Sequence, residues 1–171
     1  MLIHRAAGGV GHIAVRLAMW KGTTLIGTAS AANADHVRDL GVDEMIDDQT
    51  TRFDEVVGVV DVVFDTVGGE TRERCWDVLR RGGHLVSILG QPAADSAHGR
   101  EVRPSGVLVR PGAGRLAEIA RLIDDGHLRV TGETVLPLRR AARAHELSET
   151  GHTRDNIVLQ PDPADPAASP R

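Results

Sequence analysis

The stretch LIHRAAGGVGHIAVRLA, residues 2–18, joins a short apolar run to a helical pattern through closely spaced glycines. From Val10 to Trp20 the apolar residues recur with the period of a helix, and the apolar run before the glycines is typical of a strand. This order of strand, turn and helix suits a diphosphate. Glycine allows close backbone approach, and the helix N-terminus offers unpaired N–H groups. The alternative is that the glycines serve only a tight turn.

The glycine motif differs from the usual spelling G-x-G-x-x-G. Here it runs from Ala6 to Gly11 as AAGGVG, so that alanine occupies the first glycine position. The motif alone is a weak indication of function. The strand before it and the helix after it provide the structural context that supports a dinucleotide-binding turn.

Strand-like and helix-like segments alternate along the rest of the chain. This alternation predicts a parallel sheet with helices on both faces, a doubly wound α/β fold in one domain over residues 1–160. The polar stretch 91–105 is predicted to be a mobile loop, and the Pro/Ala/Asp-rich tail 161–171 to be disordered. Further strands are predicted at 23–28, 44–47, 60–67, 84–90, 106–110, 134–138 and 156–160, and helices at 32–40, 70–79, 113–125 and 139–149.

The composition excludes several classes of function. Of 171 residues, 41% are hydrophobic and 26% are charged, which is ordinary for a soluble globular protein. With two Phe, two Trp and no Tyr, we expect an aliphatic core and no aromatic surface for stacking nucleic acid bases. The net charge of −4 comes from interspersed acids and bases, which also argues against a nucleic acid partner.

Cysteine and histidine usage indicates a protein without disulfides or a metal site. Cys75 is the only cysteine, and the eight histidines show no paired metal spacing. His4, next to the glycine turn, is expected to be a buried side chain on a central strand. No apolar run reaches the roughly 18 residues of a membrane span, and the N-terminus lacks the pattern of a signal peptide. We therefore expect a cytoplasmic protein without a membrane partner.

The chain resembles the cofactor-binding domain of medium-chain dehydrogenases/reductases, in particular the quinone oxidoreductases of the zinc-binding dehydrogenase family. The resemblance covers about residues 1–160 and implies a Rossmann-type fold. Many of these proteins carry no zinc, and none is expected here. The resemblance is carried by LIHRAAGGVGHIAVRLAMWKG (2–22), LIGTAS (25–30), VRDLGVDEMID (37–47), VDVVFDTVGGET (60–71), RRGGHLVSILG (80–90) and HELSETGHTRDNIVL (145–159).

The resemblance also implies where a dinucleotide cofactor binds. The family's segment over the nicotinamide ribose and adenosine side falls on Asp65–Gly68. From the residues alone, that segment is equally well explained as a buried strand that ends in a turn. The implied cofactor-binding residues are Ala7, Gly8, Gly9, Val10 and Gly11 at the diphosphate, Asp65, Thr66, Val67 and Gly68 over the ribose, and Ile88, Leu89 and Gly90, after Ser87, near the nicotinamide.

The end of the second strand favours NADP(H) over NAD. Folds that bind NAD place an acid there, which bonds the ribose 2′-hydroxyl and repels a 2′-phosphate. Here Thr28, Ala29 and Ser30 occupy that place, and no acid precedes Asp35. We therefore expect NADPH to bind more tightly than NADH.

Two positions weaken this expectation. Related sequences often carry a basic residue and a tyrosine that approach the phosphate, whereas this chain has Asn33 and Asp48 there. Either Arg38 or Arg52 takes over the contact with the phosphate, or both are ordinary solvated arginines. The candidate residues for binding the adenosine ribose are Thr28, Ser30 and Asn33, which lie at the end of the second strand and just after it.

The expected function is that of an NADP(H)-dependent oxidoreductase of quinone oxidoreductase type, which transfers hydride to a quinone, an enone or a related carbonyl or alkene. The family's active site lies between the cofactor domain and a separate N-terminal catalytic domain. A small-molecule substrate is therefore expected to require both domains, and no catalytic residue is assigned. The family commonly pairs through the last strand of the cofactor sheet, so a homodimer is expected through Gly106–Arg110.

Two other functions stay open. A non-catalytic nucleotide-binding or interaction module, derived from a truncated reductase, would share the glycine turn. Methyltransferases also use a glycine turn after a first strand. They usually place an acid at the end of the second strand, where LIGTAS (25–30) has none, so they are less favoured.

Overall fold

The large sheet of the computed structural model is parallel and has six strands in the order β3-β2-β1-β4-β5-β6. The structure describes residues 1–93, 99, 101–130, 134–151 and 153–161. The strand order reverses between β1 and β4, which is where doubly wound folds open a ligand-binding crevice. The strands are β1 (Leu2–Ile3), β2 (Ile26–Ala29), β3 (Glu44–Asp47), β4 (Val60–Asp65), β5 (Leu79–Ser87) and β6 (Arg103–Gly106).

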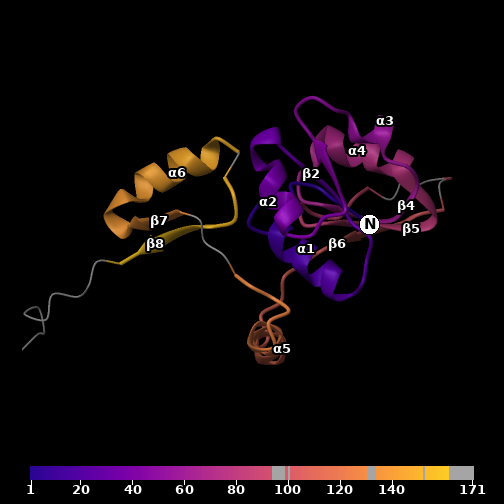
Figure 1. Ribbon diagram of the computed structural model, residues 1–171. Coiled ribbons are helices and arrows are strands. Elements are labelled where there is room, and N and C mark those ends of the chain that lie inside the picture. The colour runs from indigo at the N-terminus through magenta and orange to yellow at the C-terminus, as the bar shows by residue number, and fades with distance from the viewer. Residues whose placement is uncertain (94–98, 100, 131–133, 152, 162–171) are drawn as a thin grey trace, which may run out of the picture.

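Helices cover both faces of this sheet (Figure 1). Adjacent residues of β1 point to opposite faces, as the pleat of a strand requires. Leu2 packs into one core cluster and Ile3 into the other. The prediction of a doubly wound α/β fold is confirmed. The helices around the sheet are α1 (Gly11–Trp20), α2 (Ala34–Asp39) after the 3-10 turn η1 (Ala31–Asn33), α3 (Phe53–Val56) and α4 (Gly69–Val78).

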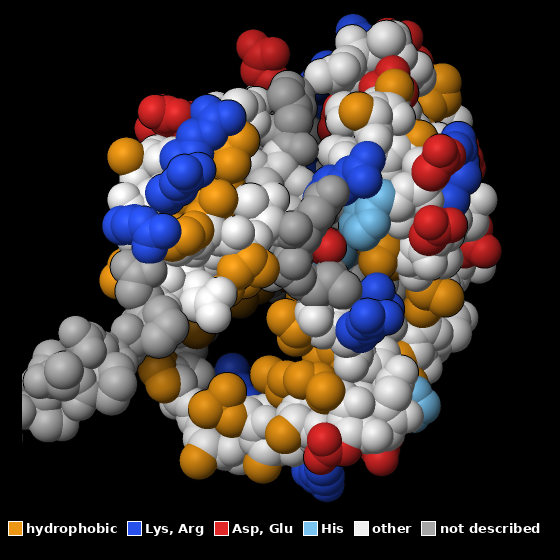
Figure 2. All heavy atoms as spheres, turned by 60° about the vertical axis from the view of Figure 1, so that its left-hand side comes forward, with side chains coloured by type: hydrophobic (Ala, Val, Ile, Leu, Met, Phe, Trp, Pro, Cys, Tyr) orange, Lys and Arg blue, Asp and Glu red, His pale blue; other side chains and the backbone are white. Residues whose placement is uncertain are grey.

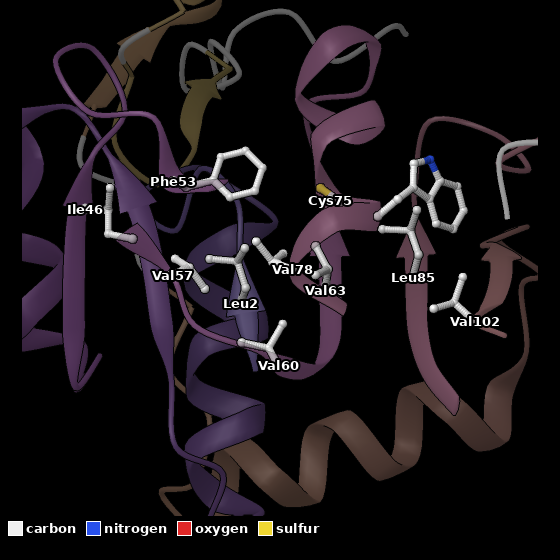
Figure 3. Packing of buried hydrophobic residues seen from close by; sticks show 11 residues of the cluster. Leu2, Ile46, Phe53, Val57, Val60, Val63, Cys75, Val78, Leu85 and Val102 are labelled. Atoms are coloured by element: carbon white, nitrogen blue, oxygen red, sulfur yellow. The ribbon is translucent and has the colours of Figure 1, made fainter. Parts of the chain in front are cut away.

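Each face has its own hydrophobic core. On one face Val15, Val37 and Leu25 pack around Ile3. On the other face Leu2, Val63 and Leu85 of the sheet pack against α3 and α4 (Figure 3). That second core includes the aromatic rings of Phe53 and Trp76, which are 5% and 3% exposed. The expectation of a purely aliphatic core is therefore wrong.

The C-terminal part of the chain lies to one side of the large sheet (Figure 1). The strands β7 and β8 form a small parallel sheet beside α6. No residue of α5 is buried, and its apolar Leu116, Ile119 and Ile123 are exposed. Figure 2, which brings the left-hand side of Figure 1 forward, shows hydrophobic side chains around a hollow. These elements are α5 (Ala113–Asp124), β7 (Thr134–Pro137), η3 (Leu138–Arg140), α6 (Ala141–Glu149) and β8 (Ile157–Gln160).

The last strand of the large sheet differs from its prediction. The register pairs His84 with Arg103 and Ser87 with Gly106. β6 therefore begins within the predicted loop 91–105 and ends at Gly106, where a strand was predicted to start. The Val107 N–H still donates to the Ser87 carbonyl, but beyond it the chain runs past the end of β5 and pairs with no strand in the described part of the chain. Leu108 and Val109 are 76% and 82% exposed. Dimerisation through Gly106–Arg110 stays a prediction.

Smaller differences occur at other boundaries. The predicted helix 32–40 divides into η1 and α2, and Leu79 is the first residue of β5 rather than the end of a helix. Two predicted segments lie partly outside the described residues: the loop at 94–98 and 100, and the tail at 162–171.

Within the described ranges, no helix has both the length and the apolar character that a membrane crossing requires. The cytoplasmic location stays a prediction.

Candidate cofactor-binding site

The glycine turn connects β1 to α1 through a tightly packed backbone. The N–H of Gly8 donates to the carbonyl of Arg5 at 2.9 Å, and a Cβ on Gly11 would overlap that same carbonyl oxygen. The close packing of α1 against the turn therefore requires glycine at position 11. Among the described residues, no group accepts a hydrogen bond from the N–H groups of Val10 or Gly11, whereas Gly9 directly follows the bridge between Gly8 and Asp155. Together with the N-terminus of α1, these donors favour an anionic ligand.

Two cavities meet at the turn. They have volumes of about 490 and 510 Å³, and Arg5, Gly8 and Thr153 line both. The first cavity extends along the ends of β2 and β3, and the second along the turn toward the ends of β4 and β5. Together they form an elongated site across the carboxyl ends of the strands, where this fold binds its ligands.

The first cavity has a positive balance of charged side chains. Arg5, Arg52 and Arg74 line it, and among its described lining residues Asp48 is the one acid. Hydroxyl groups of Thr28 and other Ser and Thr side chains provide further polar contacts. No carboxylate belongs to the end of β2 itself. A phosphate or a ribose therefore suits this cavity.

His4 forms the floor of the first cavity within a chain of hydrogen bonds. Its Nε2 lies 3.3 Å from the Cys75 Sγ, and the thiol donates to the carbonyl of Thr71. Nε2 therefore carries the proton, and Nδ1 accepts from the Thr28 hydroxyl at 3.2 Å. The ring also packs edge-on against Phe53, with centroids 4.6 Å apart.

Burial keeps both His4 and Cys75 uncharged. Desolvation, opposed by Asp65, lowers the pKa of His4 from 6.5 to about 4. Burial, with a smaller contribution from Asp65, raises the pKa of the Cys75 thiol far above its usual value. A neutral thiol is a poor nucleophile. This pair therefore supports the cavity and does not provide a nucleophile.

Asp65 organises the two loops that follow β4 and β5. Its Oδ1 accepts from the N–H groups of Val67 at 2.9 Å and Gly68 at 2.7 Å, and its Oδ2 accepts from the Ser87 hydroxyl at 2.8 Å. Ser87 Oγ in turn accepts from the N–H of Leu89. Asp65 and Ser87 are fully buried and line neither cavity. They hold the loops, which contribute Thr66 and Ile88 to the second cavity.

The segment 153–156 lies against the glycine turn. The N–H of Asp155 donates to the carbonyl of Ala7 at 2.8 Å, and a Cβ on Gly9 would overlap the side chain of Asn156. The Asp155 carboxylate contacts the rings of His12 and His36 at 3.4 and 3.2 Å. These contacts fix one wall of the second cavity.

Arg154 lies beside Asn33, one of the positions implied for the cofactor ribose. Its Nε donates to Asn33 Oδ1 at 2.6 Å, and its Nη2 donates to the carbonyl of Ala32 at 2.7 Å. Asn33 also donates to Ser30 Oγ. A guanidinium from a distant part of the sequence therefore approaches the end of β2.

The structure brings most of the implied site residues to the two cavities. Gly68, Leu89 and Gly90 line neither, like Asp65. Sequence reasoning missed Arg5, although it directly precedes the glycine motif. It also missed contributions from the C-terminal segment, because only the fold brings that segment to the turn. The implied residues that line a cavity are Ala7, Gly8, Gly9, Val10, Gly11, Thr28, Ser30, Asn33, Thr66, Val67 and Ile88.

Across the described ranges, no group of three or more His, Cys, Asp or Glu side chains lies close enough to hold a metal ion. The donor set does not fit a zinc site, so no step of the chemistry is assigned to zinc.

The parallel sheet, the glycine turn and the two cavities at its strand ends define a Rossmann-type domain with an elongated site. A family model described as "Zinc-binding dehydrogenase" matches residues 40–159. The chain belongs to this family of oxidoreductases.

Individual relatives agree with this assignment. The chain is 34% identical over 184 residues to a 2-haloacrylate reductase of a Burkholderia species, covering 94% of this chain and 55% of that protein. The structure of the quinone oxidoreductase from Coxiella burnetii superposes with a TM-score of 0.84 at 35% identity, covering 92% of this chain and 51% of that one.

A quinone oxidoreductase of Escherichia coli, solved in complex with NADPH, superposes with a TM-score of 0.79 at 29% identity. The match covers 94% of this chain and 56% of that one. This chain therefore spans about half the length of the relatives named here.

Proposed function

We propose that the chain is the cofactor-binding part of an NADP(H)-dependent oxidoreductase of quinone oxidoreductase type. The observation that carries the proposal is the glycine turn, whose N–H groups at Val10 and Gly11 have no partner among the described residues and which lines the second cavity beside Gly8, where the two cavities meet. The E. coli relative solved with NADPH supports this choice of ligand.

Each cavity suits one half of the cofactor. The first cavity, at the end of β2, takes the adenosine, and the second takes the nicotinamide half beside Thr66 and Ile88. When bound, the cofactor supplies the hydride. The chain binds and orients it: the turn holds the diphosphate, and Asp65 and Ser87 fix the loops that contact the other half.

The charge of the first cavity supports NADP(H) over NAD(H). The side chains at the end of β2 include no carboxylate. Arg52 and Arg74, which both contact the Asp54 carboxylate, line the space, and Asp48 is the one acid among the described lining residues. The Arg154 guanidinium stands at Asn33. A 2′-phosphate gains from these charges, whereas a 2′-hydroxyl gains little.

The proposed acceptor is a quinone, an enone or a related activated carbonyl or alkene. This class rests on relatives about twice as long as this chain. The acceptor must lie against the nicotinamide for hydride transfer, so the second cavity is its expected approach.

Calorimetric titration of the purified chain with NADPH and NADH tests the proposal. We expect NADPH to bind at least about tenfold more tightly, equivalent to roughly 1.4 kcal/mol. Tighter binding of NADH would contradict the NADP(H) assignment, and binding of neither would contradict the site.

NADPH oxidation with a simple quinone is then measured. Binding without oxidation would favour the non-catalytic module.

A further inference from the structure

Arg5 occupies the junction of the two cavities. It is the one residue with a charged side chain among the three that line both. It lies between β1 and the glycine turn, and its own carbonyl accepts the hydrogen bond from the Gly8 N–H. Any elongated ligand that extends from one cavity into the other passes this side chain.

The backbone at Arg5 is in a conformation that non-glycine residues rarely adopt. Its φ is +49°, in the left-handed region. Its N–H reaches the Thr28 hydroxyl at 3.3 Å, and α1 packs against its carbonyl at Gly11. The surrounding structure therefore imposes this conformation. Strain of this kind concentrates at functional sites, and here it fixes the place from which the Arg5 side chain extends.

The Arg5 guanidinium differs in its surroundings from the arginines that are paired with acids. Arg52 is paired with Asp54 and Glu55, and Arg81 with Glu101. No described acid lies within ion-pair distance of Arg5, whose Nη2 donates only to the carbonyl of Gly151, at 2.5 Å. Its remaining N–H donors are left for a ligand. This positive charge stands beside the unpartnered N–H groups of the turn, so both features attract an anion.

We propose that Arg5 binds the diphosphate of the dinucleotide cofactor, with its guanidinium facing the phosphate oxygens while the glycine turn holds them from the other side. The inference rests on the proposed function and adds a residue to it. Because Arg5 adjoins Gly8 and lines both cavities, we assign it to the diphosphate, which NADPH and NADH share, and not to the 2′-phosphate.

Substitution of Arg5 separates charge from backbone conformation. Asparagine tolerates the left-handed region, so Arg5→Asn removes the charge with little disturbance of the turn. Arg5→Lys keeps the charge but loses the two-pronged geometry of the guanidinium. Arg81→Asn, at an exposed position outside both cavities, is the matched control. Thermal unfolding of each variant verifies that it is folded.

Affinities for NADPH and NADH are measured by calorimetry at two salt concentrations. We expect Arg5→Asn to weaken both cofactors by the same factor, about tenfold to a hundredfold, as for the loss of a hydrogen bond to a charged group. Its binding also loses part of the salt dependence of the original chain. Arg5→Lys recovers part of the affinity, and Arg81→Asn binds like the original chain.

The outcomes distinguish this inference from the proposed function. If the original chain binds NADPH and Arg5→Asn binds it equally well, the role of Arg5 is refuted and the proposed function stands. A loss confined to NADPH would overturn the assignment to the diphosphate. If the original chain binds neither cofactor, the proposed function itself fails.

Discussion

At the residue scale, the site depends on two groups of buried polar side chains that hydrogen-bond to their neighbours. His4 connects the Thr28 hydroxyl to the Cys75 thiol, and Asp65 connects two loops through three hydrogen bonds. Each of these side chains lies under the cavities and shapes them. Removing one partner leaves a buried polar group unsatisfied, which is costly.

His4 makes folding sensitive to acid. Its pKa is lowered from 6.5 to about 4 in the folded chain, so between these values the unfolded chain takes up a proton that the folded chain does not. The free energy of unfolding therefore falls as the pH falls from 6.5 to 4, by about 3 kcal/mol from this group. Chemical unfolding at a series of pH values measures this loss.

Two variants identify the group responsible. We expect His4→Asn to be less stable but to lose most of this pH dependence. Thr28→Val removes a hydrogen-bond partner and keeps the imidazole, so it should retain the dependence. An unchanged slope in His4→Asn would show that His4 is not the source.

The sequence predicted the burial of His4 on a central strand but not its partners. Cys75 is 71 positions away, and no local pattern indicates that α4 brings the thiol onto the ring. Arg5 was missed for a different reason. Its strained backbone follows from the packing of α1 and the β2 contact, which a motif does not describe.

At the element scale, the glycine turn fixes how α1 sits on β1. Helical periodicity and the glycine spacing predict both elements, because these patterns are local. The structure adds a reason for two of the three glycines. Position 11 must accommodate the carbonyl of Arg5, and position 9 must accommodate Asn156 from the C-terminal segment. The sequence prediction places the last strand of the large sheet too late in the chain, because the apolar run 107–109 has the composition of a strand. In the structure the pairing of β6 with β5 ends at Gly106.

Gly11→Ala tests the packing of the turn. A Cβ at this position would overlap backbone atoms of Arg5, which cannot move aside as a flexible side chain would. We expect a loss of about 3 kcal/mol or more in the free energy of unfolding. Gly114→Ala in α5 is the matched control because no atom lies within 4 Å of its added Cβ. Its expected change is a gain of about 0.5–1 kcal/mol.

Denaturant unfolding of both variants measures the two changes. If Gly11→Ala were as stable as the original chain, α1 could shift from the turn without cost. The close approach would then not explain the glycine.

At the scale of the whole molecule, the large sheet is parallel and has a core on each face. Its strands therefore all end, at their carboxyl ends, on the same edge of the sheet. The order of strands and helices along the chain predicts this architecture, since alternating elements favour parallel crossovers. The side-by-side placement of segment 153–156 and the glycine turn is a long-range contact that sequence patterns do not contain. That contact makes the second cavity and completes the elongated site.

The central claim is that a dinucleotide lies along both cavities, across the glycine turn. Titrating isotope-labelled chain with NADPH, and recording the amide resonances by NMR, tests it residue by residue. The account predicts concentration-dependent shifts at Gly8–Gly11, at Thr28–Asn33, at Thr66 and Ile88, and near Thr153, while amides of α5 such as Ile119 stay unchanged. Saturating NADPH that leaves the resonances of Gly8–Gly11 and Thr28–Asn33 in place would contradict the account.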